Sequence, residues 1–97
     1  MSELLVVARH TIAAGKEDEV LAALPKLIEA TRAEPGTLEF TCYRQLDDPR
    51  TYVLIERYRS REDFLEHRQT DHFKELVQEY IAPRLDARVW REYRPSG

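Results

Sequence analysis

Two histidines offer the clearest prospect of chemistry in this sequence of 97 residues. His67 and His72 lie five residues apart in the stretch FLEHRQTDHF, and the whole chain holds only three histidines. An imidazole with an unperturbed pKa of about 6.5 gains and loses a proton near neutral pH, so either residue is a candidate acid or base. His67 follows Phe64 by three residues, which favours a position near the buried face of a helix. The structural alternative for His67 is a partly buried histidine that hydrogen-bonds a strand.

The spacing of the two histidines argues against a shared metal ion. Neighbours on one face of a continuous helix are three or four residues apart, so His72 is not expected on the face of His67. A break in the helix at QTD, residues 69–71, would turn His72 either toward a pocket or out to solvent. No third ligand has supporting spacing and the H-E-x-x-H motif is absent, so we expect no metal bound by the two histidines. His72 is a candidate catalytic residue whose alternative role is a local cap or a dimer contact.

Glu56 is an acid inside an otherwise apolar segment, residues 51–58. A lone buried carboxylate is costly, so Glu56 must either be paired or carry a raised pKa if it faces the core. A pair with His67 would satisfy both groups and form an acid/base unit. The alternative, given equal weight, is a structural ion pair with an arginine such as Arg9, Arg44 or Arg57.

Aromatic side chains are candidates for binding a flat substrate. We predict Phe40, Tyr43 and Trp90 as substrate-binding residues, and the alternative for Tyr43 and Trp90 is packing in the core or a dimer interface. Cys42 alternates with Phe40 and is expected to be packed core rather than a reactive thiol. His10 ends the first apolar segment and is expected at the surface.

Composition excludes several functional classes. The net charge is −3 and the charges are interspersed, so no basic stripe indicates nucleic acid. A single cysteine excludes a disulfide framework and fits a cytoplasmic location. The first apolar run is too short for a signal peptide or a membrane span, so no membrane association is expected. The three glycines are isolated, which excludes a phosphate-binding loop and a dinucleotide fingerprint. We therefore expect one cytoplasmic domain over residues 1–97.

The apolar pattern predicts four strands and two helical regions. The strands are expected at 3–12, 37–45, 51–58 and 86–94, and the helices at 16–34 and at 61–69 with a second piece to about residue 81. Pro25 lacks an N–H and clashes with the carbonyl of Leu21, so a kink or short break is predicted near Leu24. Ser60 with Asp63, and then Thr70 or Asp71, supply two expected helix caps, and the end of the chain, EYRPSG, is expected to be a solvated tail.

The element order β-α-β-β-α-β predicts a ferredoxin-like α+β fold, with a four-stranded antiparallel sheet and its helices on one face. The segments 3–12 and 51–58 do not alternate apolar with polar residues. Leu4 and Val6 lie on one side of the first strand, for example, and Leu5 and Val7 on the other. Because the helices can cover only one face, we predict that the second face packs against the same face of another copy.

A set of short motifs occurs along the chain in a fixed order. These are Gly36-x-x-x-Phe40, Asp48-Pro49, Glu56-x-Tyr58, Phe64-x-x-His67, His72-Phe73 and Pro83. The ordered set resembles the antibiotic biosynthesis monooxygenase (ABM) domain family of dimeric α/β barrels. The resemblance implies the same fold and sheet-to-sheet homodimer, with a reaction pocket between sheet and helices.

Members of that family include cofactor-independent monooxygenases that oxidise aromatic polyketides to quinones, haem-degrading enzymes, and an isomerase of a phosphorylated signalling dione. Haem degradation is disfavoured, because the relatives' strand-1 asparagine and later histidine ligand correspond here to Ala8 and Val77, and their tryptophan to His67. The isomerase branch is similar to this chain in its pair of histidines, and Arg44 or Arg68 would then grip the phosphate.

The expected function is therefore oxidation of a small aromatic or otherwise oxidisable organic molecule by molecular oxygen, with proton transfer by His67 supported by Glu56. The alternatives are the isomerase and a ligand-binding dimeric module without turnover.

Overall fold

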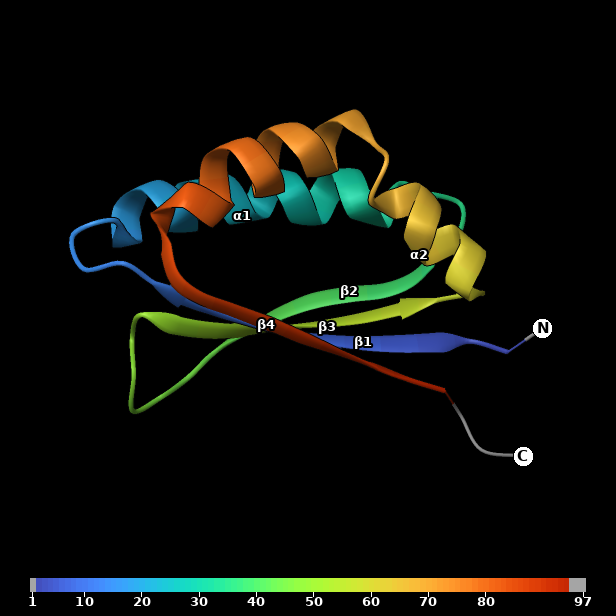
Figure 1. Cartoon of the computed structure of the whole chain (residues 1–97), viewed down its shortest axis with the longest axis horizontal. Coiled ribbons are helices and arrows are strands. Elements are labelled where there is room, and N and C mark those ends of the chain that lie inside the picture. Colours follow the sequence, from blue (N-terminus) through green and yellow to red (C-terminus); the bar gives the residue numbers. More distant parts are fainter. Residues whose placement is uncertain (1, 95–97) are drawn as a thin grey trace.

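The computed structural model describes residues 2–94, in which four strands and the intervening helices follow the predicted order (Figure 1). The elements are β1 (Leu4–Ile12), α1 (Glu17–Arg32), β2 (Thr37–Arg44), β3 (Thr51–Tyr58), α2 (Arg61–His67), the π-helix η1 (Phe73–Ile81), the 3-10 turn η2 (Ala82–Arg84) and β4 (Leu85–Tyr93). The end of the predicted solvated tail, residues 95–97, lies outside the described residues. Within residues 2–94, no helix is long and apolar enough to cross a membrane.

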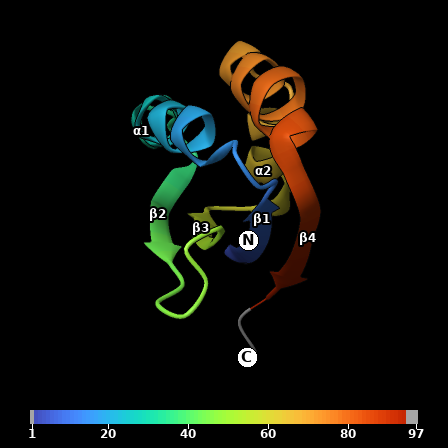
Figure 2. The ribbon, with the colours of Figure 1, turned by 90° about the vertical axis from the view of Figure 1, so that its left-hand side faces the viewer.

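The four strands form one antiparallel sheet in the order β2-β3-β1-β4. Its helices α1, α2 and η1 all lie over one face, and the sheet curves beneath them so that β2 and β4 rise at the two sides (Figure 2). This arrangement confirms the predicted ferredoxin-like fold. The opposite face of the sheet carries no element of this chain within the described residues (Figure 2).

The strand residues that face the helices form the core. Alternate side chains of β1 and β3 are buried: Leu4, Val6, Ala8, His10 and Ile12 on β1, and Tyr52, Leu54, Glu56 and Tyr58 on β3. Ala8, Ile12, Tyr52 and Leu54 pack against the buried faces of α1 and η1, whereas Leu4, Val6 and Tyr58 form a second cluster with Phe64 of α2. Each fully buried aliphatic or aromatic side chain contributes about 1.5–3 kcal/mol. Glu56 and His10 are thus polar groups placed by strand alternation inside an apolar layer.

Helix α1 runs without interruption past Pro25, so the predicted break near Leu24 is wrong. The pyrrolidine ring still removes one helical hydrogen bond, at a typical cost of about 3 kcal/mol. Pro25 is exposed, whereas Leu24 and Leu27 on either side of it are buried against the sheet. Their burial holds both halves of the helix on the same surface and offsets the cost.

Strand β2 departs from the expected alternation at its start. Strict alternation through Phe40 would place Leu38 on the side of Phe40, but the register with β3 shifts between Thr37 and Glu39, and Leu38 is 44% exposed. Leu38 is the extra residue at this bulge, and a bulge changes the direction of the side chain that it carries. Phe40 and Cys42 do lie on the helix side, and Cys42 packs against the core as expected.

The predicted helix break after His67 is confirmed. The Ser60 hydroxyl accepts a hydrogen bond from the backbone N–H of Asp63 at 3.2 Å and caps α2. Helix α2 ends at His67, and the Thr70 hydroxyl donates to the His67 carbonyl at 2.7 Å and accepts from the N–H of Phe73 at 3.2 Å. Thr70 therefore closes one helix and caps the next, which sets a new direction for η1.

Candidate functional site

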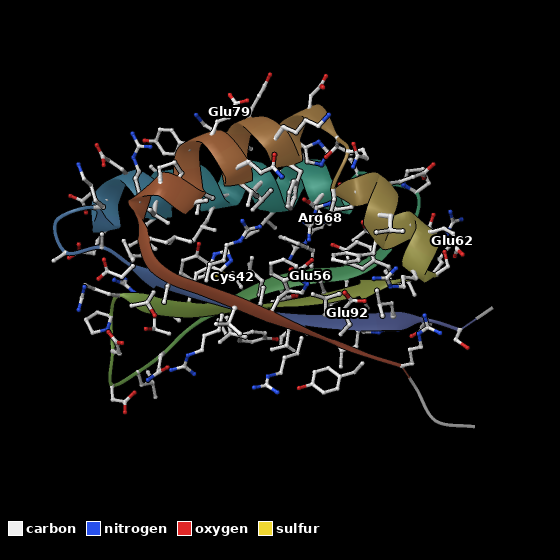
Figure 3. The ribbon with its side chains drawn as sticks, in the orientation of Figure 1. Cys42, Glu56, Glu62, Arg68, Glu79 and Glu92 are labelled. Carbon is white, nitrogen blue, oxygen red and sulfur yellow. The ribbon has the colours of Figure 1, made fainter. Side chains whose placement is uncertain are left out.

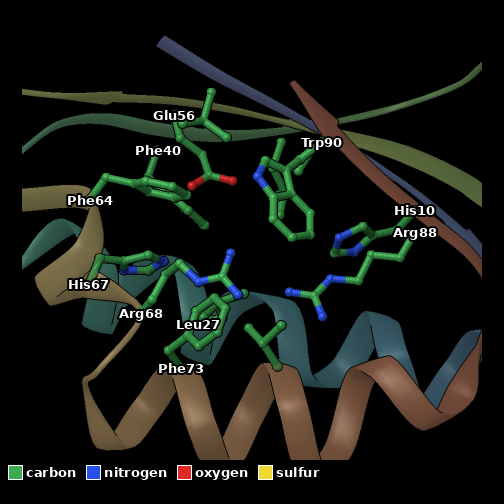
Figure 4. Close-up of a pocket in the computed structure, with 14 residues that line it drawn as sticks. His10, Leu27, Phe40, Glu56, Phe64, His67, Arg68, Phe73, Arg88 and Trp90 are labelled. Carbon is green, nitrogen blue, oxygen red and sulfur yellow. The ribbon is translucent and has the colours of Figure 1, made fainter. Parts of the chain in front are cut away.

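A narrow pocket with a cavity volume of about 30 Å³ lies between the sheet and the helices (Figure 4). Aromatic walls come from Phe40, Phe64, Phe73 and Trp90, and the polar groups in it are His10, Glu56, His67, Arg68 and Arg88. Glu56 and Arg68 point into the layer between sheet and helices, whereas Glu62 and Glu79 point away from the molecule (Figure 3). The pocket therefore combines aromatic walls with polar and ionisable side chains.

The structure brings most of the predicted site residues to this pocket. Phe40, Glu56, His67 and Trp90 all line it. Tyr43 does not, because it pairs with Val53 on the opposite face of the sheet and is 56% exposed. Strand alternation explains this: the neighbours Phe40 and Cys42 turn inward, so Tyr43 must turn outward.

His67 and His72 converge on one carboxylate, which the sequence spacing did not predict. His67 Nδ1 lies 2.8 Å and His72 Nε2 lies 2.6 Å from the same oxygen, Oε2 of Glu34. His67 is 2% exposed, Glu34 14% and His72 23%. The spacing argument holds only for a continuous helix, and the predicted break at Thr70 turns His72 toward Glu34, so the two imidazoles face the same carboxylate. The three residues form a chain of contacts from the solvent-facing edge to the pocket.

Glu34 was missed by the sequence analysis. It follows α1 and precedes Pro35, and nothing in its spacing links it to histidines that lie more than thirty residues later. Burial acts to raise the pKa of its carboxyl, but the hydrogen bonds and charges of His67 and His72 outweigh burial and hold the pKa below its usual value. Glu34 is therefore an acceptor for both imidazoles at neutral pH.

The same three groups are a set that binds metals in other proteins. Their ligand atoms lie within 4.8 Å of one another, and two histidines with one carboxylate suit iron or zinc. The distances of 2.6 and 2.8 Å to one oxygen are those of hydrogen bonds. The expectation that no metal binds here stays a prediction.

Glu56 is paired differently from the pairing we considered. Its Oε1 accepts a hydrogen bond of 2.6 Å from the Tyr58 hydroxyl, while His67 bonds to Glu34, so the direct Glu56–His67 pair is not formed. Glu56 is 5% exposed, and burial raises its pKa to about 7 despite the Tyr58 hydrogen bond and the nearby His67 and Arg88. A carboxyl of this kind can both release and accept a proton at neutral pH.

His10 is buried rather than at the surface, which corrects our expectation. It is 3% exposed, and its Nδ1 lies 2.7 Å from the Tyr52 hydroxyl. Burial, and then the charge of Arg88, lower its pKa to about 4, so the ring is neutral at pH 7. The signal was available in the sequence, since His10 shares the face of Ala8 and Ile12 on β1.

Two arginines complete the polar lining. Arg68 follows the end of α2, and Arg88 projects from β4 opposite His10. Arg44, the other arginine considered for a phosphate grip, instead donates to the Pro49 carbonyl at 2.9 Å at the β2–β3 turn. Only Arg68 of the two expected arginines therefore reaches the pocket.

Comparison with known proteins gives a consistent result. A sequence model described as "Antibiotic biosynthesis monooxygenase" matches residues 4–79. Rv0793 of Mycobacterium tuberculosis is 36% identical over 72 residues, which cover 74% of this chain and 70% of that protein. The chain spans about half (51%) of a Synechocystis relative, sll1783, at 27% identity over 77% of this chain.

Solved structures are similar over almost the whole chain. The structure of Rv0793 superposes with a TM-score of 0.91 at 29% identity, covering 99% of this chain and 97% of that one. A structure titled as an antibiotic biosynthesis monooxygenase gives a TM-score of 0.85 at 29% identity, covering 97% of each chain.

Proposed function

The chain belongs to the antibiotic biosynthesis monooxygenase family, and from this membership we propose that it is a cofactor-independent, monooxygenase-type enzyme acting on a small phenolic or hydroquinone-like molecule. The supporting observation is the buried His67, which lines the aromatic pocket while Glu34 holds its Nδ1. The proposal also places the protein in the cytoplasm, treats residues 1–97 as one domain, and takes molecular oxygen as the second substrate.

The chemistry needs a base and a site that holds an anion. In the proposed reaction His67 accepts the phenol proton, and the electron-rich phenolate transfers an electron to oxygen. The resulting phenoxyl radical and superoxide combine to a peroxide anion on a ring carbon, and the protonated His67 returns its proton to give a ring hydroperoxide. His67 then removes the hydrogen of that ring carbon as a proton, the C–H electron pair forms the quinone C=O bond, and the O–O bond breaks. The departing oxygen takes a proton and leaves as water. Phenol and oxygen thus give quinone and water, and the substrate is its own reductant.

Each proposed catalytic group has a place in this scheme. The Glu34 contact fixes the tautomer of His67 with a proton on Nδ1, which leaves Nε2 free to act as the base. His72 reaches the same carboxylate oxygen from the partly exposed side and serves as a route for the proton to solvent. Glu56, with a pKa of about 7, is the second acid/base group and returns a proton when water leaves.

The walls of the pocket suit a flat substrate. Phe40 is buried on the β2 side and Trp90 lies on the β4 side (Figure 4). Aromatic faces bind flat rings with good contact area, so we assign Phe40 and Trp90 to substrate binding. Tyr43 lies on the other sheet face and is not part of this assignment.

The uncovered sheet face supports the proposed homodimer. Leu5 and Val7 on β1 and Val53 and Ile55 on β3 occupy it. They are only half-buried within one chain, and Val89 on β4 is 54% exposed. Burying apolar surface contributes about 25 cal/mol per Å², so an apolar face of this kind favours association with the same face of another copy.

The proposal is tested by oxygen uptake on a panel of phenols and hydroquinones, followed by substitution of His67. We expect His67→Ala and His67→Gln to lower turnover at least about tenfold, the usual scale for a general base. The matched control is Gln69→Ala, an exposed residue just after the same helix. Circular dichroism of each variant separates loss of chemistry from loss of fold.

The outcomes separate the three functions. Unchanged turnover in both His67 variants contradicts the assignment of the base. Product that forms equally well without oxygen, on phosphorylated diones, identifies the isomerase. Ligands that bind without any conversion identify the non-enzymatic module.

A further inference from the structure

Two guanidinium groups lie side by side in the pocket, and the proposed mechanism does not use them. Arg68 enters from the end of α2 and Arg88 from β4 (Figure 4). The guanidinium carbon of Arg68 lies 4.8 Å from the centroid of the Trp90 ring, and that of Arg88 lies 5.5 Å from it. Both also lie over the Phe73 ring, at 5.5 and 5.9 Å. The aromatic rings therefore hold the two positive groups in place from two sides.

Neither guanidinium is neutralised by the protein. Across residues 2–94, no carboxylate forms an ion pair with Arg68 or Arg88, although Arg57, Arg59 and Arg61 each pair with an acid. Burial, and then the charge of Arg68, lower the pKa of Arg88, as expected for like charges in a half-buried place. Two unpaired positive groups therefore share a region with reduced access to water.

The remaining pocket groups do not balance this charge. Glu56 is the acid that lines the same pocket, and its pKa of about 7 leaves it only partly ionised at neutral pH. Its carboxyl is also already engaged by the Tyr58 hydroxyl. His10 is neutral at pH 7 because of its lowered pKa. The pocket thus carries a net positive charge in the absence of a ligand.

Paired guanidinium groups fit one class of ligand group. Their planar sets of N–H donors match the oxygens of a carboxylate or a phosphate, and such charge-assisted hydrogen bonds are stronger than neutral ones. Stacking on Trp90 would account for the position of one arginine, but it does not offset the repulsion between two guanidinium groups placed together. We propose that Arg68 and Arg88 together bind an anionic oxygen group of the ligand, a carboxylate or a phosphate, whose aromatic ring packs beside Trp90. This inference rests on the proposed function only in taking the same pocket as the substrate site.

The test compares an anionic ligand with its neutral amide and adds a second kind of anion. Isothermal titration calorimetry at pH 7 measures the binding of 3,4-dihydroxybenzoate, its neutral amide 3,4-dihydroxybenzamide, and phenyl phosphate. Trp90 is the single tryptophan of the chain, so a change in its fluorescence locates binding in this pocket. We expect the carboxylate to bind at least about tenfold more tightly than the amide, and phenyl phosphate shows which oxyanion is preferred.

Four variants complete the design. Arg68→Met and Arg88→Met keep most of the apolar stem and should each remove about tenfold of the preference for the acid over the amide. Arg88→Lys keeps the charge without the planar donors, so its preference for the acid over the amide should lie between those of wild type and Arg88→Met. Lys74→Met removes an exposed positive charge on η1 and should leave the preference unchanged.

Equal binding of the acid and the amide to wild type would overturn the inference. So would arginine variants that prefer the acid over the amide as strongly as the control Lys74→Met does. Binding needs no turnover, so the two proposals fail separately. Selective anion binding without oxygen uptake supports this inference and contradicts the oxygenase. Oxygen uptake on neutral phenols, with no preference for anionic ligands, supports the oxygenase and contradicts this inference.

Discussion

The pKa of Glu56 makes the stability of the fold depend on pH in an unusual direction. Its pKa rises from 4.5 to about 7 on folding, because the carboxyl is 5% exposed in an apolar layer. Between these values the folded protein keeps the proton and the unfolded chain loses it, so stability falls as pH rises. Glu56→Gln keeps an oxygen that can accept the Tyr58 hydrogen bond, but it removes the titration.

The size of the effect follows from the shift. One pKa unit corresponds to about 1.4 kcal/mol, and between pH 5 and 6.5 the unfolded carboxyl is mostly ionised whereas the folded one is mostly protonated. Over that range the Glu56→Gln variant should gain about 2 kcal/mol in free energy of unfolding relative to wild type. Wild type alone would not show this, because His10 acts in the opposite direction. With its pKa lowered to about 4, His10 favours the folded state more as pH rises toward 6.5.

The assay is urea unfolding at fixed protein concentration at pH 5.0, 5.5, 6.0 and 6.5, followed by circular dichroism. The quantity that matters is the difference in unfolding free energy between Glu56→Gln and wild type at each pH. Glu75→Gln, an exposed acid on η1, is the control and should give a difference that does not change with pH. Parallel profiles for Glu56→Gln and wild type would refute the reasoning, since they would mean that Glu56 titrates normally in the folded protein.

Three further predictions test other contacts. Glu34→Gln should lower turnover at least about tenfold, because an amide does not hold the imidazole of His67 as a carboxylate does; unchanged kcat would show that the contact does not orient the base. Activity should survive dialysis against EDTA, and loss that iron or zinc restores would show instead that Glu34, His67 and His72 hold a metal. Val53→Glu should shift the protein to monomer in sedimentation velocity, since it places a charge on the uncovered sheet face; wild type that is already a monomer at micromolar concentration would contradict the dimer.

The fold was predictable because its signals are local. The apolar runs of the strands, the Ser60 cap and the break after His67 each depend on residues close together in the sequence, and all are found in the structure. The break near Leu24 was wrongly predicted because packing on the sheet outweighs the local cost of Pro25. Burial of Leu24 and Leu27 holds the helix on the sheet. His10 was misplaced although β1 alternation continues through it to Ile12.

The site was less predictable because its contacts are not local. Glu34 meets His67 and His72 only after α1 and the second helical region pack on the same sheet face. Arg88 and Trp90 lie two residues apart on β4, so strand alternation brings both to the pocket, where Arg68 arrives from the end of α2. Composition and spacing identify residues able to do chemistry, but partners from separate elements are set by three-dimensional packing.

The pairing of β1 with β4 has a consequence for how this chain folds. It joins the first strand to the last, with Leu5 opposite Tyr93, and so closes nearly the full length of the chain into one loop. Contacts of such high sequence separation cost the most chain entropy and tend to form late in folding. Arg88 and Trp90 arrive with that strand, so an incomplete chain leaves β1 as an open sheet edge, prone to aggregation, beside a half-built pocket. The pocket is therefore complete only when the last strand has paired with the first.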